Sequence, residues 1–420
     1  MKQKKDMIET VTIEKLVHGG QGLGTLKDGR KAFIWNTLPG ETVKARITKK
    51  KKDFVEGIAE EIINKSQDRI DPKESIYLAT SPWQMMNLDA ENKYKKNIVT
   101  ETFHRENVEL PEFDMVSDGK DFGYRNKMEF SFYGDDDGLH YAFYNRGTHY
   151  KQIVHDSALA LPAINEAAKN LLLELNKLKL RAGDLKSVIL RCTQEGKTVG
   201  ALFVKPTDFP DITLPGGLSG LKVFHSNPRS PASVATKLLR TIGDIKLSDM
   251  LLGTKIEYDV VGFFQVNLPV FELALKQIDY LTVGVNNKID MYSGVGTIGI
   301  PIGGTATLVE QDSANVEMAR INVGSQQIDV VQASSEKALE YIVAGSCLIV
   351  DPPRSGLHKE VVAKILEQKP KLICYLSCNP STQARDCAVL LEVYKIRIFE
   401  AYNFFPRTPH IETLVVLELK

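Results

Sequence analysis

The second half of the chain alternates short apolar runs with amphipathic stretches, and this alternation restricts its fold more than any other feature. The apolar runs lie at residues 288–296, 305–312, 346–353 and 371–378, and the helical stretches at 269–282, 314–323, 358–368 and 381–394. Repeated strand–helix units with short connections predict a doubly wound, mostly parallel α/β sheet. Ligands of such sheets bind beyond the carboxyl ends of the strands, where the strand order reverses.

The residues before this region follow other patterns. Residues 7–67 alternate like short strands between turn glycines, which predicts a small β-barrel. Strand-like alternation continues at 113–157 and 186–260, and helical spacing predicts helices at 89–106 and 158–179. We therefore expect an OB-like barrel at 1–67, a central α+β domain at 68–88 and 113–258, and an α/β domain at 89–112 and 259–420.

Composition places the chain among folded soluble proteins. It is 43% hydrophobic and 25% charged, and no run reaches the 18 apolar residues of a transmembrane helix. Its five cysteines have no zinc or disulfide spacing, so we expect a cytoplasmic, reduced monomer without a metal or membrane contact. Residues 1–70 carry 15 Lys/Arg and 10 Asp/Glu on a chain of zero net charge, which predicts an anionic partner for the N-terminal module.

Three predicted strands begin or end at chemically reactive side chains. Asp351 ends the run IVD, Cys378 follows LICYLS, and Glu412 precedes the last apolar strand. Cys378 lies past its apolar run, so we expect a partly exposed, polar setting that raises its thiolate fraction. Cys347 and Cys374 lie inside apolar runs and are expected to be inert.

A thiol, a base and a second carboxylate match the requirements of methylation at a pyrimidine C5. A thiolate that adds to C6 makes C5 nucleophilic, and a base must later remove the C5 proton. Cys378 is the predicted nucleophile, Glu412 the base, and Asp351 the contact to the uracil edge. His410 is the other possible base, and we interpret it instead as a structural or RNA-contacting residue.

A cofactor site is predicted at the first two strands of the α/β domain. Asp290-Met-Tyr-Ser-Gly294-Val-Gly296 is a strand end followed by a glycine turn, and Glu310 ends the next strand. A carboxylate in that position can bind two ribose hydroxyls of S-adenosylmethionine (SAM) or NAD. The displaced third glycine and the later Asp-Pro-Pro motif favour SAM. Arg354 follows those prolines in place of an aromatic residue, which disfavours methylation of an exocyclic amine.

These motifs resemble those of the RNA uracil-C5 methyltransferase family. SCNPST and FPRTPHIET match its nucleophile and base segments, GFFQVN matches its FxQxN motif, and VHGGQGLG resembles a TRAM barrel. The resemblance implies three domains along the chain: a TRAM barrel, a central domain and a Rossmann-like SAM-dependent methyltransferase domain. It assigns Cys378 and Glu412 to catalysis, and the cofactor to Gln265, Tyr292, Glu310 and Asp351, in addition to Gly294, Gly296 and Thr297 of the glycine turn.

RNA is the expected partner. Basic residues beside aromatic ones are typical of single-stranded RNA contacts, and the candidates are Lys49, Lys50, Lys51, Lys52, Arg125, Lys127, Arg354 and His410. The TRAM-like barrel favours 23S ribosomal RNA by analogy, with tRNA as the alternative. A non-catalytic RNA-binding or folding factor is a further alternative. RNA cytosine-C5 methylation is disfavoured, because Pro352-Pro353-Arg354 offers no second cysteine.

Two departures from the family stand out. Many TRAM-bearing relatives hold an iron–sulfur cluster through four cysteines, whereas residues 73–88 contain none and Ser157 occupies the fourth position. We therefore predict no cluster, with Trp83, Met85 and Met86 filling the space. The segment between Gly296 and Glu310 is also short and contains Gly303-Gly304, which predicts a short helix there.

Overall fold

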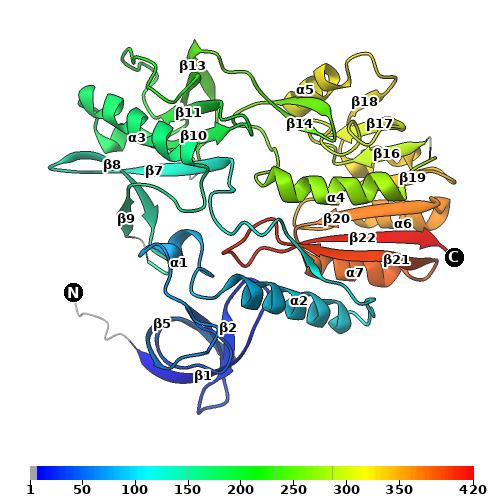
Figure 1. Ribbon diagram of the computed structural model, residues 1–420, viewed down its shortest axis with the longest axis horizontal. Coiled ribbons are helices and arrows are strands. Elements are labelled where there is room, and N and C mark those ends of the chain that lie inside the picture. The colour runs from blue at the N-terminus through cyan, green and yellow to red at the C-terminus, as the bar shows by residue number, and fades with distance from the viewer. Residues whose placement is uncertain (1–6, 149, 231, 286) are drawn as a thin grey trace.

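The computed structural model describes residues 7–148, 150–230, 232–285 and 287–420. Three β-sheet units dominate it (Figure 1): a closed barrel, a seven-stranded sheet and an eight-stranded sheet, with a separate two-stranded hairpin. The barrel lies below the two large sheets in this view, and helix α2 lies between the barrel and the eight-stranded sheet. None of the helices in the described ranges has both the length and the apolar composition that crossing a bilayer requires.

The N-terminal barrel confirms the predicted architecture. Its strands pair in the order β1-β2-β3-β5-β4 and close through β1 and β4. They span β1 Ile8–Leu16, β2 Gly22–Thr25, β3 Lys31–Trp35, β4 Thr42–Lys50 and β5 Phe54–Asn64. Alternate apolar side chains such as Val11, Ile13 and Ile34 point into the barrel, which explains the polar–apolar alternation of the sequence.

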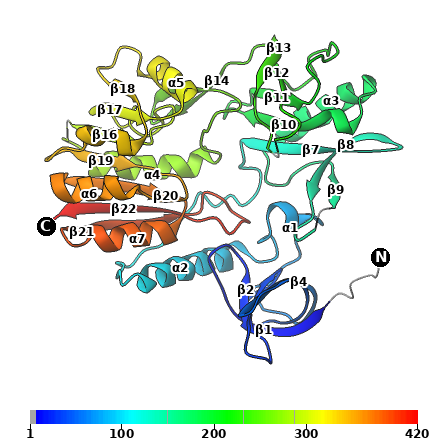
Figure 2. The ribbon, with the colours of Figure 1, turned by 180° about the vertical axis from the view of Figure 1, so that it is seen from behind.

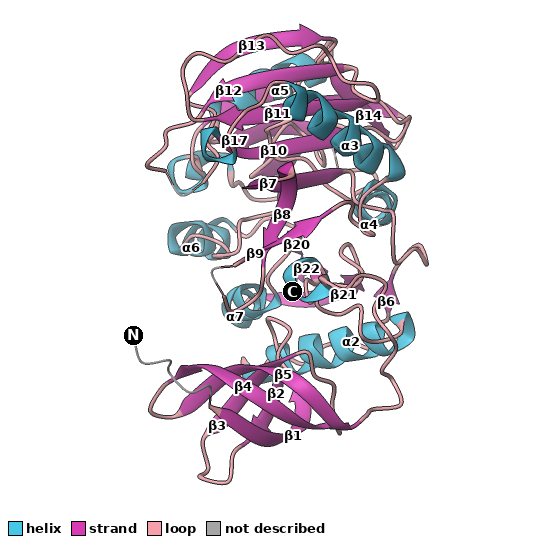
Figure 3. Ribbon diagram, turned by 90° about the vertical axis from the view of Figure 1, so that its left-hand side faces the viewer, coloured by secondary structure: helices cyan, strands magenta, loops and turns pink. Residues whose placement is uncertain are grey.

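The central unit has an α+β architecture, in which one helix packs on a seven-stranded sheet. One face of its sheet is covered by α3, Pro162–Lys177, and Figure 3 shows this sheet at the far end of the molecule from the barrel. In sheet order the strands are β13 Lys237–Gly243, β12 Gly220–His225, β11 Thr198–Val204, β10 Leu185–Cys192, β7 Lys127–Asp135, β8 Gly138–Tyr144 and β9 Lys151–Val154. The hairpin of β14 Leu247–Leu251 and β15 Thr254–Tyr258 packs instead into the core of the C-terminal unit.

The C-terminal unit confirms the doubly wound, mostly parallel sheet. Its strands in sheet order are β18 Asp329–Gln332, β17 Thr305–Glu310, β16 Lys288–Met291, β19 Cys347–Val350, β20 Leu372–Ser377, β22 Glu412–Leu419, β21 Tyr394–Tyr402 and β6 Met115–Val116. The strand order reverses between β16 and β19, which are parallel neighbours. Within this sheet β22 runs antiparallel to both of its neighbours.

Helices cover both faces of this sheet (Figure 2). One face packs against α4, Leu268–Leu281, and α5, Ser313–Val323. The other packs against α2, Leu88–Arg105, α6, Lys359–Gln368, and α7, Pro380–Leu390. The short α1, Tyr77–Thr80, lies in the connector. Trp83, Met85 and Met86 are buried in the same core as α2, and Ser157 is buried as well.

Several predicted boundaries were wrong for local reasons. The helix expected at 381–394 ends at Leu390, because β21 begins at Tyr394 to pair with the end of β22. The helix expected at 158–179 begins at Pro162, whose missing N–H suits a first helical position. Met115–Val116 joins the eight-stranded sheet beside β21, not the central sheet.

The predicted short helix after the glycine turn is not formed. Residues 297–302 make consecutive turns, with a hydrogen bond of 3.2 Å from Ile300 N to Gly296 O. The amine of Lys288 donates to the carbonyls of Ile302 and Gly303, so a buried side chain fixes the end of this segment. The segment is therefore a series of turns with isolated i→i−4 hydrogen bonds at Ile300 and Ile302, and its end is fixed by Lys288.

The barrel is fixed to the rest of the protein through its β1–β2 turn. Gly20 adopts a φ of +99°, and a Cβ there would lie 2.4 Å from the Cβ of Pro409. The carbonyl of Gly20 accepts a hydrogen bond of 3.0 Å from the indole of the buried Trp83. The turn therefore approaches the segment before Glu412 more closely than any side chain would allow.

This close approach predicts a site-specific loss of stability. Gly20→Ala should cost about 1–3 kcal/mol more than Gly19→Ala, because only the first substitution forces overpacking against Pro409. Gly19 is the matched control, since its φ of +93° is similar and a Cβ added there would meet no atom within 4 Å. Urea denaturation of both variants tests this, and equal losses would contradict the contact.

Candidate active site

Asp351, Cys378 and Glu412 meet at one edge of the eight-stranded sheet. Asp351 and Cys378 directly follow the parallel neighbours β19 and β20, so both lie at carboxyl ends. Glu412 is the first residue of β22, whose antiparallel pairing sets Thr413 opposite Ser377. The sequence prediction that these three strands deliver their reactive groups to one place agrees with this register.

The loop that carries Cys378 is held by its neighbours. Asn379 caps α7 by accepting a hydrogen bond from Ser381 N, and Pro380 occupies the first turn of that helix. The amide of Asn379 also donates to the carbonyl of Arg354 at 2.7 Å, and the hydroxyl of Thr382 donates to the same carbonyl. The SCNPST and DPPR segments therefore form one connected unit.

A second set of hydrogen bonds fixes the start of β22. The hydroxyl of Thr413 donates to the side chain of Gln383 at 2.6 Å. The amide of Gln383 donates to the carbonyls of Tyr375 and Thr413, at 2.8 and 3.2 Å. Gln383 on α7 thus ties β20 to β22 beside Cys378 and Glu412, a role that the sequence patterns did not reveal.

Burial and mutual repulsion perturb the acidic groups of this edge. Burial raises the pKa of Asp351 to about 7. Burial, with the charge of Asp351 as a smaller cause, raises the pKa of Glu412 well above its usual range, while Arg354 opposes the shift. Carboxyl groups with raised pKa values in one cluster are typical of catalytic sites.

The thiol of Cys378 differs from its predicted state. The side chain is partly exposed, as expected. Partial burial, followed by the charges of Glu412 and Asp351, raises its pKa to about 12, and Arg354 lowers it only in part. Burial, with the neighbouring carboxylates as a smaller cause, therefore disfavours the thiolate in this structure, in contrast to the expected rise in thiolate fraction.

Basic and imidazole groups from three parts of the chain surround the cluster. His18 lies in the β1–β2 turn of the barrel, and burial with the charge of Arg354 lowers its pKa. Burial and the same arginine lower the pKa of His410 to about 4, with Arg125 and His18 contributing. His410 also packs edge-on against Phe405 at 5.6 Å. Sequence reasoning missed His18, although it lies in the VHGGQGLG turn used to recognise the barrel.

A cavity of 840 Å³ opens beside this edge. It is lined by the ends of β16–β18 and by α6 and α7, including Tyr292, Glu310, Ser334, Ser335, Glu336, Pro353, His358, Val362, Arg385 and Asp386. Its volume lies within the roughly 300–1,000 Å³ of typical small-molecule sites. Pro353 belongs to the DPPR segment, so the cavity adjoins the sheet edge that carries Asp351.

Glu310 is held in a suitable position for a ribose. Its two carboxylate oxygens accept hydrogen bonds from Gly294 N at 2.9 Å and Asp312 N at 2.8 Å. Tyr292 lines the same cavity in a left-handed conformation, and its hydroxyl accepts from Ser335 at 2.7 Å. An oriented carboxylate at the end of the second strand fits the ribose of SAM.

The other predicted cofactor residues are not among those that line this cavity; they are Gln265, Gly294, Gly296, Thr297 and Asp351. Gly296 and Thr297 form the turn after β16, and Gly299 N donates to the buried Asp290 at 2.8 Å. Gln265, in the GFFQVN segment, is buried. Its backbone carbonyl accepts a hydrogen bond of 3.0 Å from the side-chain amide of Asn126. This contact joins the central sheet to the C-terminal unit.

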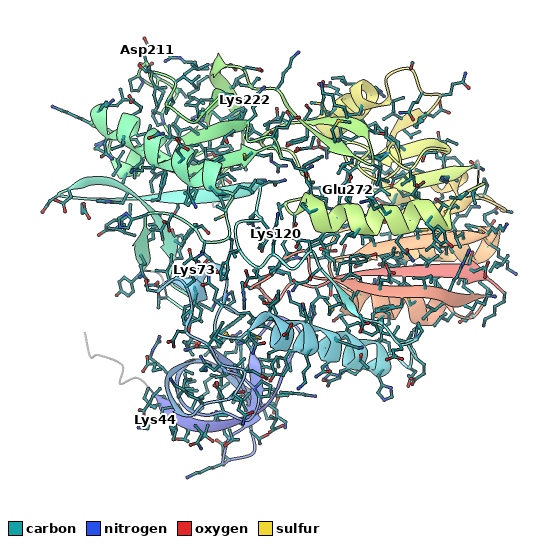
Figure 4. The ribbon with its side chains drawn as sticks, viewed as in Figure 1. Lys44, Lys73, Lys120, Asp211, Lys222 and Glu272 are labelled. Carbon is teal, nitrogen blue, oxygen red and sulfur yellow. The ribbon has the colours of Figure 1, made fainter. Side chains whose placement is uncertain are left out.

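The predicted RNA-contacting residues divide into two groups. Lys49, Lys50, Lys51 and Lys52 lie at the β4–β5 turn of the barrel, and Lys49 pairs with Glu56 at 2.6 Å. Arg125 lies over the ring of Phe405, and burial lowers the pKa of Lys127 to about 8. Lys44, which lies on the same strand β4 as Lys49 and Lys50, marks the outer surface of the barrel in Figure 4.

Within the described ranges, no group of three or more His, Cys, Asp or Glu side chains is arranged to hold a metal ion.

Comparisons with known proteins agree with this geometry. Residues 262–420 match the model of the tRNA (Uracil-5-)-methyltransferase family, and residues 7–59 match the TRAM domain. A protein of Thermotoga maritima described as an uncharacterized RNA methyltransferase is 28% identical, with 98% of this chain and 99% of that protein covered. One of Listeria innocua with the same description is 29% identical, with 99% of each chain covered.

One solved structure is similar over almost the whole chain. It is the tRNA (uracil-54, C5)-methyltransferase of Pyrococcus abyssi in complex with S-adenosyl-L-homocysteine. It is 25% identical with a TM-score of 0.78, and the match covers 97% of this chain and 100% of that one. The fold and site therefore define a SAM-dependent RNA methyltransferase. More specifically, residues 262–420 belong to the RNA uracil-5 methyltransferase family and are joined in this chain to a TRAM domain at residues 7–59.

The perturbed thiol predicts slow, pH-dependent alkylation of Cys378. With a pKa of about 12, the rate of reaction with iodoacetamide should rise about tenfold per pH unit between about pH 7 and 9. Asp351→Asn should accelerate alkylation at a fixed pH, because it removes a charge that raises this pKa. Mass spectrometry of the labelled peptide measures both effects.

Cys378→Ala is the control for this labelling, since the four other cysteines are buried. A rate that already reaches a plateau below about pH 8 would contradict the raised pKa.

Proposed function

We propose that this protein forms 5-methyluridine in RNA, with Cys378 as nucleophile, Glu412 as base and 23S ribosomal RNA as substrate. The observation that carries the proposal is the meeting of Asp351, Cys378 and Glu412 at one sheet edge beside the cavity of Glu310. A cofactor site next to a thiol–carboxylate pair supplies what methylation at an unactivated pyrimidine carbon requires.

The proposed reaction begins with the thiolate of Cys378. It forms a bond to C6 of the uracil, and the displaced electron pair moves through C5 to the oxygen at C4, giving an enolate. When bound, SAM would supply the electrophilic methyl group, which C5 would take up with the electron pair returned from the enolate, leaving S-adenosylhomocysteine. The carboxylate of Glu412 then removes the C5 proton, and the returning electron pair breaks the C6–S bond and releases Cys378.

The electrostatics of the cluster suit these roles. A carboxylate with a raised pKa is a stronger base, so the environment of Glu412 favours removal of a carbon-bound proton. Arg354 opposes the pKa rise of both Glu412 and Cys378, which favours their charged, reactive forms. Asp351, with a pKa of about 7, can exchange a proton at the uracil edge near neutral pH.

The target uridine must leave its stack to reach Cys378, because the thiol lies at the sheet edge and not on a surface strand. Arg125, Lys127, Arg354 and His410 are proposed to contact the displaced nucleotide and its neighbours. The four lysines at 49–52 are proposed to contact phosphates further along the RNA, since they lie at a turn of the barrel.

tRNA is the second candidate substrate, and one specific observation favours it. The Pyrococcus abyssi protein is a tRNA methyltransferase, and its similarity extends through the barrel as well as the catalytic unit. The barrel alone therefore does not discriminate between the two RNAs, and a direct assay of both is needed.

The proposal predicts 5-methyluridine in one RNA class only. Purified protein incubated with SAM and either unmodified 23S ribosomal RNA or unmodified tRNA should yield 5-methyluridine in the ribosomal RNA, measured by nucleoside mass spectrometry. Cys378→Ala should yield none, because it lacks the thiol that adds to C6. Product in tRNA alone would reassign the substrate, and product from Cys378→Ala would remove the proposed nucleophile.

Glu412→Gln should separate adduct formation from release. Cys378 can still attack C6, but the amide cannot accept the C5 proton, so a covalent protein–RNA complex should accumulate. Denaturing gel electrophoresis with labelled RNA measures it, and the Cys378→Ala/Glu412→Gln double variant is the control. Release at the wild-type rate would show that another group is the base.

A further inference from the structure

The segment that leads into Glu412 is irregular and strained. Residues 403–411 form no helix or strand, and Arg407 has a φ of +65°. Residues other than glycine rarely adopt this left-handed backbone conformation unless neighbouring groups stabilise it. Since Glu412 follows five residues later, whatever holds Arg407 also influences where the proposed base lies.

A buried ion pair on α2 contacts this segment directly. Glu91 and Lys95 lie one turn apart, their charged atoms are 2.8 Å apart, and both side chains have 0% exposure. The carboxylate of Glu91 accepts hydrogen bonds from Arg407 N at 2.9 and 3.1 Å. It thereby satisfies the backbone donor of the residue with the unfavourable φ.

Glu91 and Lys95 also form hydrogen bonds with the beginning of the 403–411 segment. Asn403 donates to Glu91 at 3.1 Å and accepts from the amine of Lys95 at 2.7 Å. Lys95 also donates to the carbonyl of Phe405 at 3.2 Å. The beginning and the middle of the irregular stretch are therefore held by one turn of one helix.

Other contacts hold the pair and the segment in place. α2 is anchored to the eight-stranded sheet by the buried side chains of Ile98, Val99 and Phe103. The carbonyl of Arg407 accepts from Trp83 N at 3.1 Å, and its guanidinium donates to Met86 O and Asp121. The clamp formed by Glu91 and Lys95 therefore connects the base segment to a helix that is itself packed into the core.

Burying two charges is costly, and apolar residues would pack such a site at least as stably. A pair of apolar side chains could not, however, accept from Arg407 N or bind both ends of the Asn403 amide. The ion pair is thus explained by the conformation it imposes on the segment rather than by stability.

We propose that Glu91, with Lys95, is a positioning residue that sets the carboxylate of Glu412 for removal of the C5 proton. The inference rests on the proposed function. It assigns to α2 a role in the last chemical step, separate from RNA binding and from addition of Cys378 to C6.

The test uses full-length protein, SAM and an RNA that the wild type methylates, labelled with tritium at uridine C5. Glu91→Ala should lower kcat for tritium release by about 10- to 100-fold, the effect of a displacement near 1 Å. A covalent adduct should persist, while the KM for SAM stays unchanged. Glu91→Gln should keep most of the activity, because its amide oxygen can still accept from Arg407 N.

Lys93→Ala is the matched control, since Lys93 lies exposed on the same helix. A folded Glu91→Ala protein that releases tritium at the wild-type rate without a persistent adduct would overturn the proposal. A wild type that methylates no RNA would instead contradict the proposed function itself.

Should Glu91→Ala not fold, Asn403→Ala tests the same contact from the segment and leaves the ion pair intact. A persistent adduct with this variant supports the clamp. An adduct lifetime equal to that of the wild type would overturn it.

Discussion

The antiparallel pairing of β22 with β20 is the constraint on which the site depends. In a wholly parallel sheet, the first residue of the last strand would lie at the amino edge, far from the other strand ends. Because β22 runs the opposite way, Glu412 at its start lies beside Ser377 and Cys378 at the end of β20. Gln383 holds that pairing from α7, and Asn379 connects the thiol loop to the DPPR segment.

This convergence also explains the electrostatics. Three groups that become negative on ionisation share a poorly solvated edge. Burial raises the pKa values of Asp351, Cys378 and Glu412, and the charges of neighbouring carboxylates add to the shifts of Cys378 and Glu412. Arg354 is the cation that opposes the shifts of Cys378 and Glu412. Such an arrangement costs stability, and sites of this kind persist because the perturbed groups are reactive.

The base segment is also where the separate units of the protein meet. The β1–β2 turn of the barrel approaches Pro409, the connector contributes Trp83, and α2 contributes Glu91 and Lys95. Asn126 of the central unit donates a hydrogen bond to the backbone carbonyl of Gln265 in the GFFQVN segment. These contacts join the barrel, the connector, α2 and the central unit to the segments at the catalytic edge.

The sequence by itself determined the local patterns and the chemistry. Strand–helix alternation specified the doubly wound sheet, turn glycines specified the barrel, and the motifs around Cys378, Glu310 and Glu412 predicted the candidate site, because each depends on residues close in the chain. Only the tertiary structure decided the environment of the Cys378 thiol, the turns after Gly296, and the placement of His18, Glu91 and Gln383 near the site. Those properties arise from groups distant in sequence and brought together by packing, which no local pattern encodes.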